Sequence, residues 1–153
     1  MKKEVLLKID NLSSGYGSTI IVNNFSFDVE KGQILAITGS NGMGKTTLMK
    51  TIMGLIDVRE GSIFFKNEDI TNSSPDYRSK SGIGYVPQGR EIFSALTVEQ
   101  NIMLPIYTRK KPSFDVSEKL EEIYSLFPIL KEKRSANGSS LSGGQQQQLA
   151  IAR

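Results

Sequence analysis

The chain has 153 residues, a net charge of +3 and a hydrophobic fraction of 38%, which is typical of one globular domain with a sizeable core. It contains no cysteine and no histidine, so disulfide frameworks, thiolate or imidazole metal sites and catalytic triads are excluded within it. The charge is too small to indicate nucleic acid as a partner, and no apolar run is long enough to span a bilayer. We expect a domain of cytosolic type.

The first part of the chain is expected to form strands around one turn. Residues 4–10 alternate in polarity and residues 20–29 carry spaced apolar side chains, so both stretches are predicted to be strands. Residues 13–17 have the composition of a turn and are predicted to form a loop with Tyr16 at its tip. A tyrosine in such a place most often packs partly buried, and the functional alternative is that its ring stacks on a nucleotide base.

A glycine-rich loop follows the next predicted strand. Residues 34–38 form a short apolar run, as expected of a parallel strand buried on both faces. Residues 39–47 read GSNGMGKTT and fit the phosphate-loop pattern G-x-x-x-x-G-K-[ST]. Leu48, Ile52 and Leu55 then recur at helical spacing, which predicts a helix from about Lys45. Strand, loop and helix follow in the order that this motif requires.

The composition of this loop indicates a nucleoside triphosphate site. Its glycines let successive amides curl around phosphate oxygens. Lys45 is expected to reach the β- and γ-phosphates, the Thr46 hydroxyl to ligate Mg²⁺, and the helix dipole to favour the same anion. Thr47 is a lesser candidate. The predicted phosphate-binding residues are Gly39, Ser40, Asn41, Gly42, Gly44, Lys45, Thr46 and Thr47.

The middle of the chain predicts a small antiparallel sheet beside this nucleotide core. Residues 63–65 read as a strand, and Ser74 with Pro75 suits the start of a short helix. Residues 83–86 are predicted to form another strand, ending at Pro87. Gln88 follows at the end where a parallel sheet places ligand-binding loops, although a loop glutamine alone is usually just solvated.

Residues 93–134 are expected to be mainly helical. Thr97 and Gln100 have the spacing of a capping box, which predicts a helix from Thr97 to about Tyr107. Apolar residues at i, i+3, i+4 and i+7 predict a second helix that Pro128 ends. We interpret this region as a helical subdomain, and the basic runs 109–111 and 131–134 as solvated faces.

A second loop with chemical meaning precedes the last predicted helix. Residues 135–140 have the composition of a flexible linker, and residues 141–145 then read LSGGQ. Ser142 is a natural N-cap, and two glycines lie in the first turn of a helix that includes Gln145–Gln148. A helix start with unpaired amides and a serine hydroxyl is a second anion site, and an ordinary capped helix is the alternative.

Together, the phosphate loop and the LSGGQ stretch resemble the nucleotide-binding domain of ABC-type ATPases, over nearly the whole chain. The resemblance implies an α/β, P-loop NTPase-like fold with an antiparallel β subdomain and a helical subdomain. It divides the chain into a nucleotide core at about 1–88, a helical subdomain at about 89–140 and the signature with the start of its helix at 141–153.

The same resemblance assigns roles to single residues. It implies that Tyr16 stacks on adenine and that Gln88 approaches Mg²⁺ and the attacking water. Two such domains pair head to tail in this family, so each ATP lies between two subunits. The signature residues Ser142, Gly143, Gly144 and Gln145 would then touch the γ-phosphate of the ATP held by the partner's phosphate loop.

A narrower resemblance lies in residues 85–102, YVPQGREIFSALTVEQNI, and in the run LSGGQQQQLAIAR. These look like the ATPase subunits of bacterial importers for branched-chain amino acids, and most like the branch for urea or short-chain amides. This implies a second ABC ATPase subunit in a homo- or heterodimer, integral membrane permeases and, indirectly, a substrate-binding protein. It implies a peripheral position on the cytoplasmic face of the cell membrane and no nucleic acid.

Within this group, the region after the glutamine faces the membrane subunits. The docking surface is therefore expected near residues 88–97. Exchange of Arg90 and Glu91 for alanine is expected to uncouple ATPase activity from the permeases.

The chain also departs from the family, because it stops at Arg153. The family's next strand ends in an Asp that orders Mg²⁺ and a Glu that polarises water, and a switch histidine follows later. We therefore expect a fragment that alone is poorly soluble and catalytically inactive, from a parent ATPase that powers import. The alternatives are an exporter subunit, a non-transport ABC ATPase acting on ribosomes or DNA, and a truncated nucleotide-binding remnant without catalysis.

Overall fold

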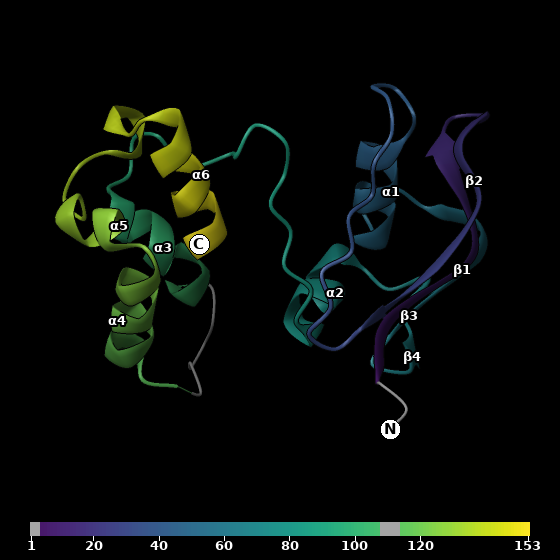
Figure 1. The fold of residues 1–153 in the computed structure, drawn as a ribbon, viewed down its shortest axis with the longest axis horizontal. Helices are drawn as coiled ribbons and strands as arrows, with labels where there is room; N and C mark the ends of the chain where they lie inside the picture. The colour runs from purple at the N-terminus through teal and green to yellow at the C-terminus, as the bar shows by residue number, and fades with distance from the viewer. Residues whose placement is uncertain (1–3, 108–113) are drawn as a thin grey trace. The chain divides into compact units, whose positions relative to one another are not determined.

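The computed structural model describes residues 4–107 and 114–153, and the chain divides into two compact units (Figure 1). The N-terminal unit is Met1–Tyr85 and the helical unit is Val86–Arg153. The predicted basic run 109–111 lies outside the described residues. The finer division at residues 88 and 140 stays a prediction.

The N-terminal unit is built on a four-stranded antiparallel sheet with the order β2-β1-β3-β4. Its strands are β1 (Val5–Tyr16), β2 (Thr19–Glu30), β3 (Val58–Phe65) and β4 (Glu68–Asp69). The predicted antiparallel sheet is therefore present, and it includes the first two predicted strands. The predicted turn at residues 13–17 is shorter than expected, because β1 continues to Tyr16, which pairs with Thr19 across a tight hairpin.

Two helices complete this unit. The first, α1 (Lys45–Ile52), places Leu48 and Ile52 in a core shared with the sheet. Leu55 is 52% exposed instead of continuing this stripe, because the helix ends at Ile52 and the chain turns at Gly54. The second, α2 (Pro75–Ser81), begins as predicted, with the Ser74 side chain accepting a hydrogen bond from the Tyr77 amide.

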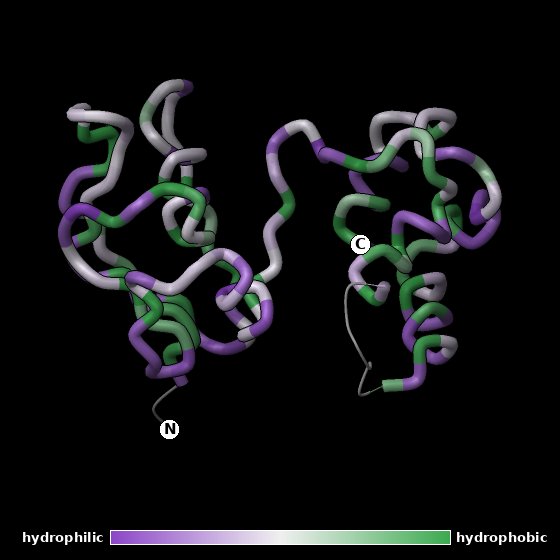
Figure 2. The backbone as a smooth tube through the Cα atoms, turned by 180° about the vertical axis from the view of Figure 1, so that it is seen from behind, coloured by the Kyte–Doolittle hydropathy of each residue, from purple (hydrophilic) through white to green (hydrophobic). Residues whose placement is uncertain are grey.

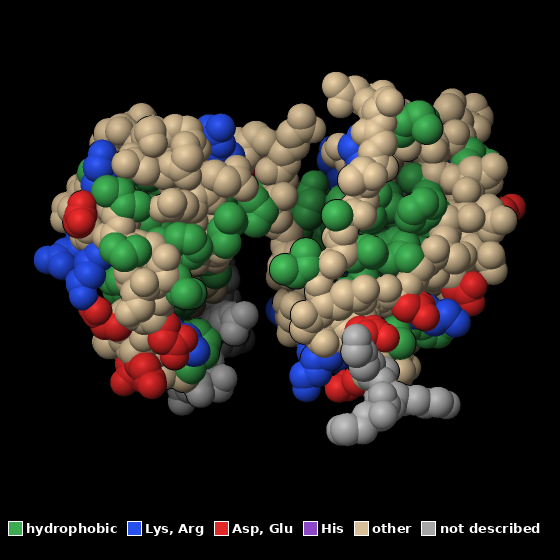
Figure 3. Space-filling model, viewed as in Figure 1, with side chains coloured by type: hydrophobic (Ala, Val, Ile, Leu, Met, Phe, Trp, Pro, Cys, Tyr) green, Lys and Arg blue, Asp and Glu red, His purple; other side chains and the backbone are tan. Residues whose placement is uncertain are grey.

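Two predicted strands are wrong in this structure. Residues 33–40 and 83–87 contain no strand, and Ile34 is 96% exposed. A strand needs a hydrogen-bonding neighbour, and both edges of β1 are occupied by β2 and β3. An apolar run predicts burial but supplies no pairing partner, and no described strand pairs with either segment. Hydrophobic side chains gather on the viewed face of the N-terminal unit (Figure 3).

The helical unit contains α3 (Val98–Tyr107), α4 (Val116–Leu126), α5 (Pro128–Glu132), the 3₁₀ helix η1 (Gly138–Ser140) and α6 (Gly143–Ala152). The predicted capping box is confirmed, because the Gln100 amide donates to Thr97 Oγ1 at 3.1 Å and the Thr97 amide donates to Gln100 Oε1 at 2.9 Å. Pro128 follows the end of α4 as predicted, and it also begins α5.

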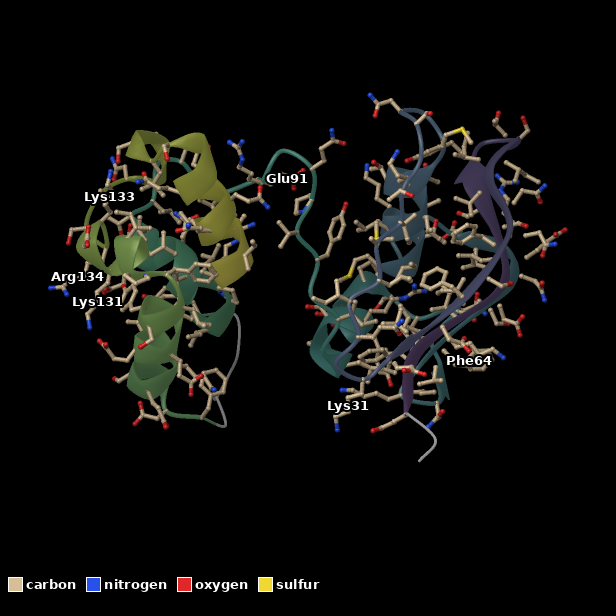
Figure 4. All side chains as sticks on the ribbon, viewed as in Figure 1. Lys31, Phe64, Glu91, Lys131, Lys133 and Arg134 are labelled. Carbon is tan, nitrogen blue, oxygen red and sulfur yellow. The ribbon has the colours of Figure 1, made fainter. Side chains whose placement is uncertain are left out.

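The core of the helical unit gathers apolar side chains from every helix except η1, and Figure 2 shows hydrophobic segments in each of them. Asn101 is fully buried, and its side chain both accepts from the Phe93 amide and donates to the Phe93 carbonyl, each at 2.9 Å. This pair fixes the segment before α3 against the helix. Lys131, Lys133 and Arg134 extend outward from the end of α5 (Figure 4), as expected of a solvated face.

Across the described ranges, every helix is too short or too polar to cross a membrane.

Candidate functional site

The phosphate loop has the glycine-dependent backbone that its sequence predicts. Gly39, Gly42 and Gly44 have φ values of 154°, 84° and 87°, which side chains with a Cβ rarely adopt. Gly44 is also the N-cap of α1 and offers no side-chain acceptor. A Cβ there would lie 3.0 Å from Ile21 Cγ2 and 3.2 Å from its carbonyl oxygen. The first amides of α1 therefore lack a side-chain cap and are available to an anion.

Lys45 places its charge at the centre of this loop. Its ammonium donates to the carbonyl oxygens of Gly39 and Ser40, both at 2.7 Å. Thr46 is exposed beside it, whereas Thr47 is only 6% exposed. The loop thus offers one ammonium, the hydroxyls of the exposed residues Ser40 and Thr46, and amides without a side-chain cap, whereas Thr47 is buried. Ser40 and Asn41 are exposed on the loop.

The exposed hydroxyl of Thr46 is a candidate ligand for Mg²⁺ in this unit. Mg²⁺ in nucleotide sites keeps several waters and takes few protein ligands together with substrate phosphates. In residues 4–107 and 114–153 no cluster of three or more acidic side chains could hold a metal by itself. An exposed hydroxyl in the first turn of α1 suits a site in which waters and phosphates supply most of the Mg²⁺ ligands. It does not suit a site built from protein ligands alone.

A buried arginine anchors the opposite end of α1. Arg78 in α2 is 2% exposed, and its Nη1 donates to the carbonyl oxygens of Thr51 at 2.9 Å and Ile52 at 2.7 Å. Its Nη2 and Nε donate to the carbonyls of Thr71 and Ser73. Burial lowers the pKa of Arg78, and a guanidinium still keeps its charge. The positive charge therefore meets the negative end of the helix that carries the phosphate loop.

Sequence reasoning missed Arg78. It lies in a polar segment, YRSKS, where a single sequence indicates a solvated helix. Only the folded contacts identify its role.

Tyr16 lies at the end of β1 with 52% of its surface exposed. It lines a hollow of about 440 Å³ in the N-terminal unit, together with Gly17, Leu55, Asp57 and Arg59. The Arg59 guanidinium donates to the Gly17 carbonyl, which fixes the hairpin tip. The ring is therefore open to a flat ligand on its exposed side.

The signature turn in the helical unit has the predicted cap. The Gln145 amide donates to Ser142 Oγ at 3.4 Å, and the Ser142 amide donates to Gln145 Oε1 at 3.0 Å, which forms a capping box. Leu141 is buried in the core, whereas Ser142, Gly143 and Gly144 are exposed. A Cβ on Gly144 would meet no atom within 4 Å. The turn is thus held from the core side and open on the other.

Gln88 is exposed in a turn at the start of the helical unit. Two residues further, Arg90 Nη1 donates to Gln146 Oε1 of α6 at 3.0 Å. The Arg90 guanidinium also lies beside the signature turn, with Nη2 3.3 Å from the position of a Cβ on Gly143. Sequence reasoning treated Arg90 as part of a docking surface and missed this contact, which no local pattern predicts.

Comparisons with known proteins show the family to which the chain belongs. The ABC transporter family profile matches residues 22–153. The chain is 37% identical to the probable branched-chain amino acid transport ATP-binding protein LivF of Archaeoglobus fulgidus, over 96% of this chain and 61% of that protein. It is 35% identical to the high-affinity branched-chain amino acid transport ATP-binding protein BraG of Pseudomonas aeruginosa, over 97% and 63%. The chain thus spans about three fifths of the length of these curated relatives.

Solved structures agree with the fold. cbiO1 from Clostridium perfringens, part of an ABC transporter complex, superposes with a TM-score of 0.82 at 26% identity, over 98% of this chain and 61% of that one. A dimeric bacterial ABC transporter cassette gives a TM-score of 0.81 at 26% identity, over 96% and 68%. The predicted α/β fold class is confirmed. Both the motifs and the matched length lead to one conclusion: the chain belongs to the ABC transporter family of ATP-binding proteins.

Proposed function

We propose that this chain is the ATP-binding part of an importer ATPase subunit, with the phosphate loop as its nucleotide site, and that the full-length parent protein hydrolyses the ATP. The observation that carries the proposal is the ammonium of Lys45, which donates to two carbonyls of a loop whose neighbouring amides lack a side-chain cap. When a triphosphate enters, its oxygens replace these carbonyls as acceptors for Lys45. The loop amides and the start of α1 hold the remaining negative charge.

Phosphoryl transfer to water needs positioning and charge stabilisation more than covalent chemistry. Thr46 would hold Mg²⁺, which would offset the negative charge of the phosphates. The exposed Gln88 side chain is assigned to the attacking water and the metal, and the open ring of Tyr16 to the adenine base.

The signature turn is proposed to act on a second subunit. Its exposed amides and the Ser142 hydroxyl would contact the γ-phosphate held by the partner's phosphate loop, so that two subunits close on two ATP molecules. A dimeric cassette among the structural relatives supports this arrangement. Integral membrane permeases would dock near residues 88–97 on the cytoplasmic face of the membrane, and a substrate-binding protein would act through them.

The proposed substrates are branched-chain amino acids, with urea or short-chain amides as the alternative. LivF and BraG support the first choice. The relatives also include an iron importer of Fusobacterium nucleatum and a spermidine/putrescine importer of Clostridium acetobutylicum. Uptake of labelled leucine and of labelled urea by cells with and without the gene separates the two choices. If uptake of neither compound falls when the gene is absent, both substrate proposals are refuted.

The nucleotide site itself is tested by exchange of Lys45 for alanine in the purified full-length parent protein. Nucleotide affinity and ATP turnover should fall by at least about a hundredfold, because a charge-assisted contact to two phosphates is lost. Lys50→Ala, in the same helix, is the matched control and should keep both. Equal nucleotide affinity in the Lys45→Ala and Lys50→Ala proteins would refute the site.

A further inference from the structure

We propose that Arg90 is a positioning residue for the signature turn: it ties the segment after Gln88 to the first turns of α6. The proposal rests on the function proposed above and adds a residue that the motifs do not include. It starts from the contact between Arg90 Nη1 and Gln146 Oε1, which are 3.0 Å apart and separated by 56 residues in sequence. Both residues belong to the helical unit.

The backbone at Arg90 is itself unusual. Arg90 and Glu91 have φ values of 71° and 48°, in the left-handed region that non-glycine residues rarely adopt. Such a conformation persists only where surrounding contacts impose it. Here the Arg153 guanidinium donates to the Glu91 carbonyl at 2.9 Å and lies 5.2 Å from the centroid of the Phe93 ring. Glu91 lies on the segment that leads from Gln88 toward α3 (Figure 4).

The strained segment is therefore held at both of its sides by α6. Arg90 reaches Gln146 in the second turn of the helix, and Arg153 at the end of the helix reaches back to Glu91. Asn101 fixes Phe93 from α3. The three contacts give the segment after Gln88 a defined position relative to α6.

The Arg90 contact bears on the signature turn rather than on the helix in general. The guanidinium fills the space beside Gly143, so that a Cβ on Gly143 would lie 3.3 Å from Nη2 and 3.5 Å from Nη1. By contrast, a Cβ on Gly144 would meet nothing within 4 Å. Arg90 thus supports one side of the turn and leaves the open side free. It also adds a positive charge next to amides that are proposed to meet a phosphate.

The expectation that Arg90 serves permease docking stays a prediction, and these contacts give Arg90 a role within the helical unit. A side chain that donates to α6 and is packed over Gly143 is engaged within its own unit. Removal of the guanidinium should loosen the signature turn and slow turnover, while nucleotide binding to the phosphate loop is unaffected. The effect on turnover is expected to depend on the contact between Arg90 and Gln146.

The test uses the purified full-length parent protein with Arg90→Ala, Gln146→Ala and the double variant. Each single variant should lower kcat about tenfold, the usual effect of losing one charge-assisted hydrogen bond, and the double variant should be no worse than either. The KM for ATP and the nucleotide affinity should stay within about twofold. Arg90→Lys keeps one donor and should recover part of kcat. Arg134→Ala, an exposed arginine of the same unit (Figure 4), is the matched control and should behave as the unaltered protein.

A readout that does not need turnover separates this proposal from the function it rests on. Amide hydrogen exchange at residues 145–147 should be faster in Arg90→Ala, with no change in α1. If exchange rises but no variant and no unaltered protein hydrolyses ATP, the proposed function fails and the positioning role stands. If ATP is hydrolysed and Arg90→Ala matches the control in kcat and in exchange, the positioning role is wrong. The positioning role would also be wrong if the loss of kcat in the double variant were the product of the two single losses.

Discussion

At the scale of single residues, Tyr124 of α4 shows how burial sets chemistry in the helical unit. It is 3% exposed, and its hydroxyl donates to Glu99 Oε2 at 3.1 Å. Burial, followed by the bond to the Glu99 carboxylate, raises the pKa of Tyr124 to about 12. The residue therefore stays neutral in the folded protein at a pH where a solvated tyrosine ionises.

This shift predicts a loss of stability in strong base. The unfolded chain releases the Tyr124 proton near pH 10 and the folded protein only near pH 12. Between these values the folded state binds more protons, so the free energy of unfolding falls as the pH rises, and the contribution is complete below about pH 10. Urea unfolding at several pH values should show a steeper decline for the unaltered protein than for Tyr124→Phe. Parallel declines would contradict the shift.

At the scale of elements, Arg78 connects α2 to the C-terminal end of α1. Its four hydrogen bonds satisfy carbonyls that a helix end and a buried turn would otherwise leave unpaired. Arg78→Met should lower the free energy of unfolding by about 3 kcal/mol or more, because several buried acceptors lose their donor together. Lys80→Ala in the same helix, whose charge pairs with Asp76 at the surface, should change it little. Thermal or urea unfolding measures both, and similar losses for the two variants would argue against the anchor.

Elements differ in how well the sequence predicts them, and the difference has a physical basis. The starts of α3 and α6 were predictable because a cap is made by residues three positions apart, and the start of α2 because proline is favoured at the first helical position. The glycine loop was predictable because its residues are also close together in sequence. A strand also needs a partner strand elsewhere in the chain. The apolar runs at 34–38 and 83–86 are therefore not enough to predict strands. The contacts of Arg78 and Arg90 join residues far apart in sequence, and no local pattern encodes them.

At the scale of the whole molecule, the apolar surface of the N-terminal unit predicts a measurable property. Ile34 is 96% exposed and Leu35 is 41% exposed, in a segment that no described strand pairs with. A contiguous exposed apolar segment promotes association. The 153-residue polypeptide should bind a hydrophobic dye, and Ile34→Ser should lower the signal clearly. Leu126→Ser removes a single apolar side chain of α4 that is 73% exposed and should lower it little. If both substitutions lower the dye signal equally, the signal does not come from this segment.

The central claim is that the phosphate loop of one subunit and the signature turn of another bind the same ATP. Sedimentation velocity of the purified protein with a non-hydrolysable ATP analogue and Mg²⁺ tests it most directly. The unaltered protein should dimerise only with nucleotide. Gly144→Ala should bind nucleotide but stay monomeric, because its new methyl group has free space within the folded unit and would collide with the proposed partner subunit. A Gly144→Ala protein that dimerises as readily as the unaltered one, or a dimer that forms without nucleotide, would contradict the claim.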